Sequence, residues 1–155
     1  MRRAVLCLAL LLLPATAFAG DGKWTAEMQE DEGGSVMVAS VSIKPVGDLV
    51  PTLSLMCAGT EGVNLRYETS TGGAEPASEA DFVLKTDKAE LSKHMVFEEM
   101  DGAYAAYFQP TDAAIALLKG GTEVAITQTG SSGPAQTFPL AGSSKAIDTL
   151  LKSCE

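Results

Sequence analysis

Residues 52–68 read Thr-Leu-Ser-Leu-Met-Cys-Ala-Gly-Thr-Glu-Gly-Val-Asn-Leu-Arg-Tyr-Glu, and this stretch decides the fold. It contains two short segments in which every second residue is apolar, namely Leu53, Leu55 and Cys57, then Val63, Leu65 and Tyr67. Alternation with period two is typical of a strand that buries one face. Because the turn signal Gly-Thr-Glu-Gly separates the two segments, the stretch predicts an antiparallel hairpin.

Similar short strands are expected on both sides of this hairpin. The candidate segments are residues 35–43, 81–86, 94–99, 103–109, 123–127 and 136–140. Between two of them, the pair Asp101-Gly102 predicts a second tight hairpin with both turn positions at positive φ. About seven short strands predict a mostly β domain, either an antiparallel β-sandwich or a partly open barrel.

Two short helices are expected near the C-terminus. The first covers residues 112–119, with Thr111 as its N-cap and Gly120 as its end. The second is the C-terminal helix, whose apolar residues have the spacing of one helix face: Ile147, Leu150, Leu151 and Cys154. Three polar segments are expected outside these elements: residues 20–34, in which Trp24 packs onto the domain, the surface loop 69–80, and residues 87–93.

The first 19 residues predict export. A basic start, a short apolar run and small residues at Ala17 and Ala19 are the three parts of a secretory signal peptide. Cleavage after Ala19 would leave residues 20–155 as a single mature β domain in the periplasm. The apolar run is too short to remain as a spanning helix, and no later segment predicts a stable membrane anchor.

The charge of the mature chain limits its partners. Residues 1–19 hold two of the 11 basic residues and none of the 20 acidic ones, so cleavage changes the net charge from −9 to −11. Such a surface repels phosphate backbones and anionic head groups, which disfavours nucleic acids and membrane surfaces. Another envelope protein, a basic one in particular, suits this charge.

Two cysteines, Cys57 and Cys154, remain after removal of the signal peptide. An even number in an oxidising compartment favours a disulfide bond. Cys57 lies on the apolar phase of its strand and Cys154 on the apolar stripe of the last helix, so both are expected to point inward and to meet. A redox or metal pair is less favoured, because the chain has no Cys-x-x-Cys motif and one histidine.

The sequence predicts a non-enzymatic protein without cofactor or metal. A hydrolase that used His94 as its base would need a serine or cysteine nucleophile, and no Gly-x-Ser-x-Gly elbow is present. Glu98 and Glu99 are adjacent, so on a strand they face opposite ways and cannot act as a pair. A copper site of His94 with nearby methionines is less favoured, because Met95 alternates in phase with Phe97 as core residues do.

Candidate interaction residues lie around the second hairpin. Asp101 and Gly102 form its turn, and Tyr104 and Tyr107 supply aromatic surface beside it. If Tyr104 faces the core, Tyr107 faces outward, because neighbouring positions alternate along a strand.

The order of these segments resembles that of two families of periplasmic proteins. The elements that carry the resemblance are Leu53-Ser-Leu-Met-Cys57, Val63-Asn-Leu-Arg-Tyr67, Ile115-Ala-Leu-Leu-Lys-Gly, Val124-Ala-Ile, Phe138-Pro-Leu-Ala-Gly142 and Ala146-Ile147 with Leu150–Cys154. They are similar to the TagO/VasI proteins associated with type VI secretion and to the invasion-associated locus B proteins, over roughly residues 50–155. The resemblance implies a shared β fold with a bridge from a strand cysteine to the terminal helix.

Three functions remain open. The first is a periplasmic interaction or accessory protein of the cell envelope that acts through loops 44–51 and 69–80 and the Asp101-Gly102 hairpin. The second is a small inhibitor of a wall hydrolase such as lysozyme, because an acidic β domain with a protruding hairpin suits the cleft of a basic enzyme. The third is a binder of a small ligand in a barrel mouth.

Overall fold

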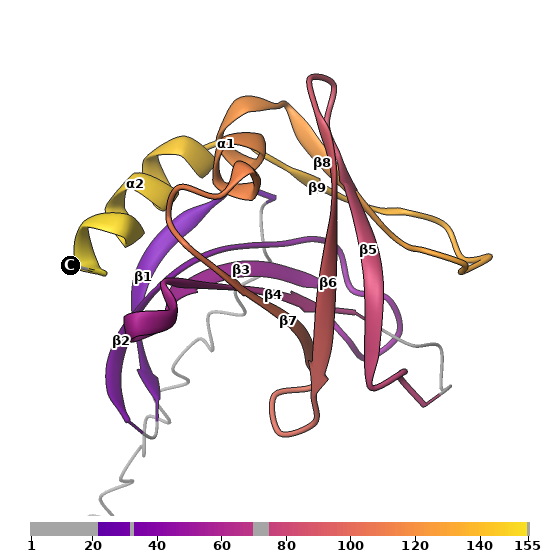
Figure 1. Ribbon diagram of the computed structural model, residues 1–155, viewed down its shortest axis with the longest axis horizontal. Coiled ribbons are helices and arrows are strands. Elements are labelled where there is room, and N and C mark those ends of the chain that lie inside the picture. The colour runs from indigo at the N-terminus through magenta and orange to yellow at the C-terminus, as the bar shows by residue number, and fades with distance from the viewer. Residues whose placement is uncertain (1–21, 32, 70–74, 155) are drawn as a thin grey trace, which may run out of the picture.

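The computed structural model of the protein describes residues 22–31, 33–69 and 75–154. The predicted signal peptide, residues 1–19, lies outside these ranges, and so do positions 70–74 of the expected surface loop. Within them, the prediction of a mostly β fold with two helices is confirmed (Figure 1).

Nine strands occur in the described ranges, and all belong to one antiparallel sheet. They are β1 (Thr25–Asp31), β2 (Gly34–Ser42), β3 (Thr52–Cys57), β4 (Val63–Glu68), β5 (Glu79–Lys85), β6 (Glu90–Glu98), β7 (Ala103–Phe108), β8 (Glu123–Gln128) and β9 (Gln136–Pro139). Their order in space is β1-β2-β3-β4-β7-β6-β5-β8-β9. The sequence predicts either a β-sandwich or a partly open barrel. Because a sandwich needs two sheets, the single sheet corresponds to the partly open barrel.

The hairpin of β3 and β4 is confirmed. Leu55 pairs with Leu65 across it, and the short 3-10 helix η1 (Gly59–Glu61) connects the strands. Gly62, at the end of the turn, has a φ of +94°, and a Cβ there would lie 2.6 Å from the carbonyl oxygen of Phe108. Position 62 therefore requires glycine, both for its backbone conformation and because β7 approaches it closely.

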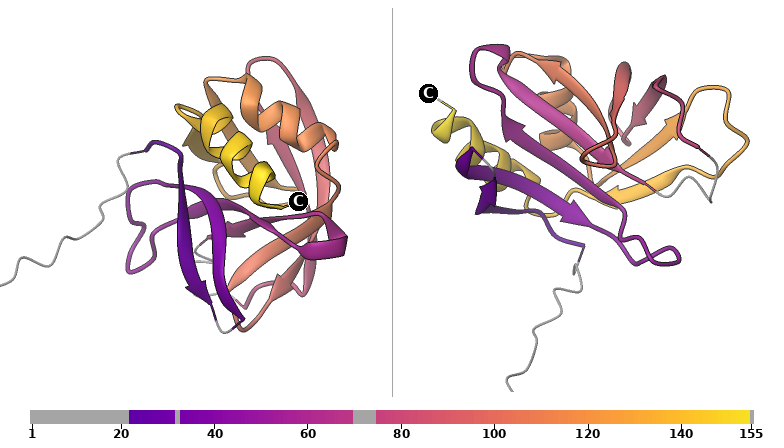
Figure 2. Two further views of the ribbon diagram at one scale, coloured as in Figure 1. Left: turned by 90° about the vertical axis from the view of Figure 1, so that its left-hand side faces the viewer. Right: turned by 90° about the horizontal axis from the view of Figure 1, so that it is seen from below.

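The two edges of the sheet approach each other at Trp24, which directly precedes β1. Its backbone N–H donates to the carbonyl of Ala141 at 2.9 Å, and its indole Nε1–H donates to the carbonyl of Pro139, the last residue of β9, at 3.0 Å. Trp24 is 2% exposed, so the expectation that it packs onto the domain is confirmed. The curvature of the sheet between these edges is visible in Figure 2.

The helices α1 (Ala113–Gly120) and α2 (Ser143–Ser153) lie side by side against the inner face of the curved sheet (Figure 2). They share one hydrophobic core with the strands, and its largest fully buried side chains are Phe82, Phe138, Leu53, Leu55, Leu65, Leu84, Met95, Leu118, Ile126, Ile147, Leu150 and Val41. Among the described residues, neither helix is long and apolar enough to cross a bilayer.

Two segments expected to lie outside strands belong to the sheet. The acidic stretch at residues 20–34 contains β1, whose charged side chains suit an exposed edge strand. The segment at residues 87–93 was expected to cross the surface, but β6 already begins at Glu90. The reason is a tight turn, in which the Thr86 hydroxyl accepts the N–H of Ala89 at 3.0 Å. Pairing with a neighbouring strand, rather than burial of side chains, places both segments in the sheet.

Two local expectations also need correction. Asp112, not Thr111, is the N-cap of α1, because its carboxylate accepts the N–H of Ala114 at 2.8 Å. The β6–β7 hairpin is confirmed, but its turn has four residues, Glu99–Gly102, of which Gly102 alone has positive φ (+63°).

Candidate interaction site

The strand register brings three connections to one end of the sheet. Thr52 pairs with Glu68, Glu68 pairs with Ala103, and Ala103 pairs with Glu98. The β2–β3 loop, the described ends of the β4–β5 connection and the β6–β7 hairpin therefore adjoin one another. These are the three segments from which the sequence predicts interactions.

A cluster of side chains lies on the outer face of the sheet beside the β6–β7 hairpin. We call it the hairpin face, and it consists of Met56, Asn64, Arg66, Glu98, Asp101 and Tyr107. Register explains why these residues meet: Met56 pairs with Asn64, and Asn64 pairs with Tyr107. Directly paired residues point to the same side of a sheet, so the three form a row across β3, β4 and β7.

Arg66 is the central charged group of the hairpin face. Its guanidinium lies 2.6 Å from Asp101 Oδ2 and 3.4 Å from Glu98 Oε2, and its side chain is 13% exposed. Arg66 Nη1 also lies 4.0 Å from the sulfur of Met56. Both carboxylates approach the same guanidinium nitrogen, Nη2, so one positive charge is balanced by two negative ones. Arg66 thus holds the hairpin turn against the outer face of the sheet.

Tyr107 is half exposed but fixed in position. Its hydroxyl donates to Glu98 Oε1 at 2.8 Å. Partial burial, this hydrogen bond and the negative charge of Glu98 raise the pKa of the Tyr107 hydroxyl to about 12. Tyr107 therefore remains a neutral hydrogen-bond donor with a ring that is open to solvent.

Asn64 is the unusual member of the row. It is 3% exposed, and its side-chain oxygen Oδ1 has no hydrogen-bond partner among the described residues. Buried polar atoms in folded proteins are nearly always paired. Leaving one unpaired typically destabilises the fold by about 1–3 kcal/mol.

An open hollow of about 530 Å³ lies over the hairpin face. Its rim is formed by the β3–β4 turn on one side and the hairpin turn on the other, with Glu61, Glu99 and Met100 among its lining residues. Met100 is 93% exposed at the tip of the turn, and Tyr107 is 49% exposed. The hollow thus combines exposed apolar groups with an excess of carboxylates.

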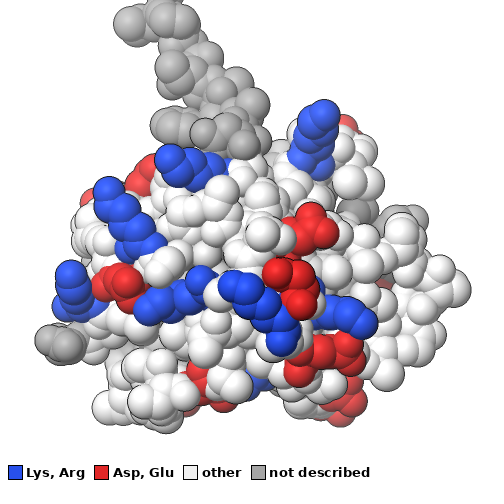
Figure 3. Space-filling model, turned by 90° about the horizontal axis from the view of Figure 1, so that it is seen from above, with Lys and Arg blue, Asp and Glu red and all other residues white. Residues whose placement is uncertain are grey.

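The charges of the molecule are unevenly distributed. Lysines lie on α1 and α2 and beside the β5–β6 turn, and include Lys85, Lys88, Lys119, Lys145 and Lys152. Figure 3 shows Lys and Arg side chains across the face seen from above. Arg66 is the sole basic residue among the described residues that line the hollow. Local charge at the hairpin face is therefore negative.

Of the four candidate interaction residues, Asp101, Gly102 and Tyr107 belong to the hairpin and its outer face. Tyr104 faces the opposite way and is 2% exposed. Its ring packs edge-on against Phe82 at 4.8 Å and Phe97 at 5.1 Å between ring centres. Tyr104 therefore contributes to the core and not to the hairpin face.

Tyr104 instead lines a second cavity of about 640 Å³ at the open end of the barrel. Tyr67 and Gln136 also line it, and the Tyr67 hydroxyl donates to Gln136 Oε1 at 2.9 Å. Burial raises the pKa of Tyr67. Val46 from the β2–β3 loop lies at the rim.

His94 lies on the surface and is 56% exposed on its side chain. Its Nδ1 lies 2.9 Å from Asp81 Oδ1, and its Nε2 lies 3.6 Å from Glu79. The hydrogen bond to Asp81, supported by both carboxylate charges, raises the pKa of His94. Met95 is buried in the core. Its sulfur is therefore not placed to bind a metal ion together with the exposed imidazole of His94.

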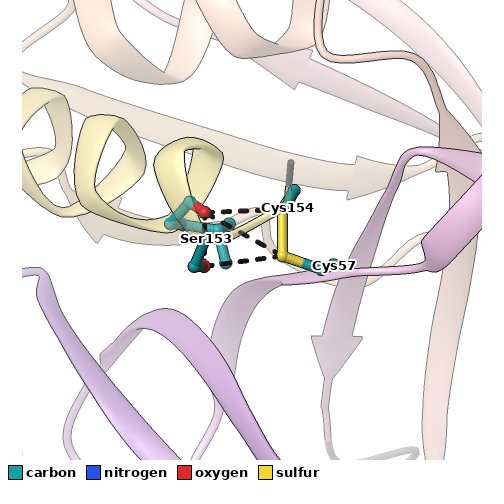
Figure 4. The surroundings of a disulfide bond; sticks show 4 residues. Cys57, Ser153 and Cys154 are labelled. Carbon is teal, nitrogen blue, oxygen red and sulfur yellow. Dashed lines mark hydrogen bonds between the residues drawn. A yellow bond between two sulfur atoms is a disulfide. The ribbon is translucent and has the colours of Figure 1, made fainter.

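The predicted disulfide bond between Cys57 and Cys154 is confirmed, with 5.3 Å between the α-carbons. Figure 4 shows Ser153 beside the bridge, where its hydroxyl donates to the carbonyl of Leu150 at 2.6 Å and lies 3.6 Å from Cys57 Sγ. Cys57 also lines the hollow. The bridge joins the end of α2 to the strand that carries Met56.

Sequence reasoning did not identify Asn64, Arg66 or Glu98 as members of a site. The alternation of residues 63–67 does place Asn64 and Arg66 on the face opposite the core. This alternation does not show which strand lies beside β4. That strand is β7, which neighbours β4 in the sheet but not in the sequence.

Comparison with known proteins shows a similar fold among solved structures. No family model and no curated protein matches the sequence. The crystal structure of invasion-associated protein B from Bartonella henselae is similar, with a TM-score of 0.60 and 16% sequence identity over 85% of this chain and 94% of that one. This result supports the part of the predicted resemblance that concerns the locus B fold, whereas no comparison supports the TagO/VasI resemblance.

Proposed function

We propose that this protein is a non-enzymatic interaction module of the cell envelope, exported to the periplasm, and that it binds another envelope protein through the hairpin face. The observation that carries the proposal is that Met100 and Tyr107 are exposed beside a hairpin turn whose position is held by the ion pairs of Arg66 with Glu98 and Asp101. Tyrosine, methionine and arginine are enriched in protein interfaces. Anchors that are held before binding lose less conformational freedom on association.

The location in the periplasm is supported by the disulfide bond, which is stable in oxidising compartments. The N-terminal sequence has the three parts of a signal peptide. The fold shared with invasion-associated protein B is compatible with an accessory role.

Site-specific photo-crosslinking in living cells tests this proposal. A photoreactive phenylalanine analogue at Met100 is expected to give a defined adduct, because this side chain projects from the tip of the turn. The same analogue at Lys152, which is exposed on α2, serves as the matched control. The adduct at position 100 should weaken when Tyr107→Ala is introduced, since this change removes an adjacent anchor. Equal adducts from both positions, or none from position 100, would exclude the hairpin face.

Inhibition of a wall hydrolase is a specific form of the same function. The acidic hairpin, with Glu98, Glu99 and Asp101, favours a basic enzyme. Purified protein would then inhibit members of a lysozyme panel, and Asp101→Ala would relieve this inhibition. If the protein inhibits no lysozyme of the panel, the inhibitor hypothesis is rejected, whereas the general interaction role is unaffected.

A second candidate function is the binding of a small neutral ligand in the barrel mouth. It is favoured by the cavity of about 640 Å³, which combines aromatic walls with the hydrogen-bonded pair of Tyr67 and Gln136. Fragment screening by NMR would locate shifts at Tyr67 and Tyr104 if this site binds ligands. Shifts confined to other surfaces would contradict it.

A further inference from the structure

The starting point is the unpaired oxygen of Asn64. This atom is buried, and its residue lines the hollow of about 530 Å³ over the hairpin face. An acceptor without a partner calls for a donor, and the described part of the chain supplies none. A ligand that pairs with this atom presents an N–H or O–H group.

The charges around the hollow favour a positively charged ligand. Four carboxylates line it, Glu61, Glu98, Glu99 and Asp101, against one basic group, Arg66. Arg66 is already engaged by Glu98 and Asp101. Among the described residues, no ion pair involves Glu61 or Glu99. Glu61 comes from the β3–β4 turn and Glu99 from the hairpin turn, and both line the hollow.

The apolar lining suits a cationic group on a long hydrocarbon stem. Met56, Met100 and the ring of Tyr107 lie around the same hollow. The stem of a lysine or arginine packs against such groups while its head stays near carboxylates, and an aromatic ring attracts a cation placed over its face. Met56 is the direct cross-strand neighbour of Asn64, and its unbranched side chain can adapt to a group that enters beside it.

We propose that the hollow accepts the cationic side chain of a lysine or arginine from a protein partner. The N–H groups of this side chain donate to Asn64 Oδ1, and its charge is neutralised by Glu61 and Glu99. The inference rests on the proposed function and deepens it, because it names the chemistry that the partner presents to the hairpin face.

Peptide titration followed by NMR tests the inference on the disulfide-bonded protein. The probes are acetyl-Ala-X-Ala-amide peptides in which X is arginine, lysine or norleucine. The arginine and lysine peptides should shift the side-chain amide of Asn64 and the backbone amides of residues 98–101 in a saturable way. Norleucine has the same apolar stem without charge and should not. Equal shifts from norleucine, or cationic shifts confined to the barrel mouth, would overturn the inference.

Two kinds of variant separate binding from folding. Asn64→Leu keeps the size of the side chain but removes the unpaired oxygen, so unfolding should need at least as much denaturant while the arginine peptide binds roughly tenfold more weakly. Unchanged peptide affinity in Asn64→Leu would contradict the role of Oδ1.

The second variant leaves the buried row intact. Glu61→Gln combined with Glu99→Gln alters two exposed side chains, so it remains informative if Asn64→Leu does not fold. Peptide affinity should fall and its dependence on salt should weaken, whereas Glu123→Gln, an exposed change on β8, should have no effect. If the cationic peptides do not bind but the photoreactive analogue at position 100 still gives an adduct, the cation site alone is rejected. If the peptides bind but no adduct forms, the proposed function alone is rejected.

Discussion

At the scale of single residues, Arg66 determines the shape of the hairpin face. It is mostly buried on the side of the sheet that carries no helix, and its charge is balanced by Glu98 and Asp101 from the neighbouring hairpin. Removing one partner of such a pair leaves an uncompensated charge, which is more destabilising than an exposed ion pair is stabilising. The position of the hairpin turn is thus tied to one side chain of β4.

Asp112 provides a residue-scale prediction with a defined pH dependence. Burial opposes its ionisation, but the N–H of Ala114 and the ammonium of Lys93 at 2.7 Å outweigh this effect and lower its pKa. Its stabilising contribution is therefore present above the unfolded pKa of about 3.9 and is lost as the pH falls through the lower folded value. Asp112→Ala should reduce the free energy of unfolding by about 1–2 kcal/mol at pH 7.

Urea denaturation at neutral and strongly acidic pH measures this effect. At pH 7, Asp112→Asn should reduce the free energy of unfolding by less than Asp112→Ala does, because asparagine remains a good N-cap. Asp148→Ala, which removes another aspartate paired with a lysine at an exposed site, is the control and should change stability by less than about 1 kcal/mol. A wild-type advantage over Asp112→Asn that persists at the lowest pH would show that the carboxylate charge is not responsible.

At the scale of elements, α2 is attached to the sheet in two ways. Ala146, Ile147 and Leu150 are buried against the inner face. The disulfide bond then joins the residue after the helix to the end of β3. The first attachment is distributed over the helix, whereas the second acts at its last turn.

Removing the bridge should therefore weaken the fold without abolishing the helix. The two cysteines are 97 positions apart. Closing a loop of this length stabilises by about 4.7 kcal/mol in the chain-entropy model, and removal of a native disulfide from a small secreted domain typically costs about 2–5 kcal/mol. Cys57→Ala with Cys154→Ala should lower the free energy of unfolding by an amount in this range. Hydrogen exchange should increase most in the last turn of α2, and an increase confined to β8 and β9 would contradict this account.

At the scale of the whole molecule, the N-terminal and C-terminal segments support each other. Trp24 connects the start of β1 to the end of β9, and α2 packs on the first three strands. Contacts between distant parts of the chain favour a cooperative transition, because neither part retains its core alone.

We therefore expect the domain to unfold in one step. Fluorescence of Trp24, the one tryptophan in the chain, reports on the joined edges, and far-ultraviolet circular dichroism reports on the sheet. With the disulfide intact, the two signals should give the same midpoint in guanidinium chloride. A fluorescence change that precedes the loss of β structure would show that the edges separate independently.

The sequence by itself determined the elements whose side chains alternate or form a stripe. The β3–β4 hairpin, the inward residues of β5 and β8, the C-terminal helix and the cysteine pair all follow from the period of burial, which is a local property. The sequence also indicated that Tyr107 faces outward if Tyr104 faces the core.

Tertiary structure alone decided the rest. β1 is a strand because β2 pairs with it, although its own side chains are mostly polar. The hairpin face exists because β7 lies beside β4, which brings Asn64 and Arg66 to Tyr107, Glu98 and Asp101. Local periodicity specifies which side of a strand a residue occupies, but only the order of strands in the sheet specifies its neighbours.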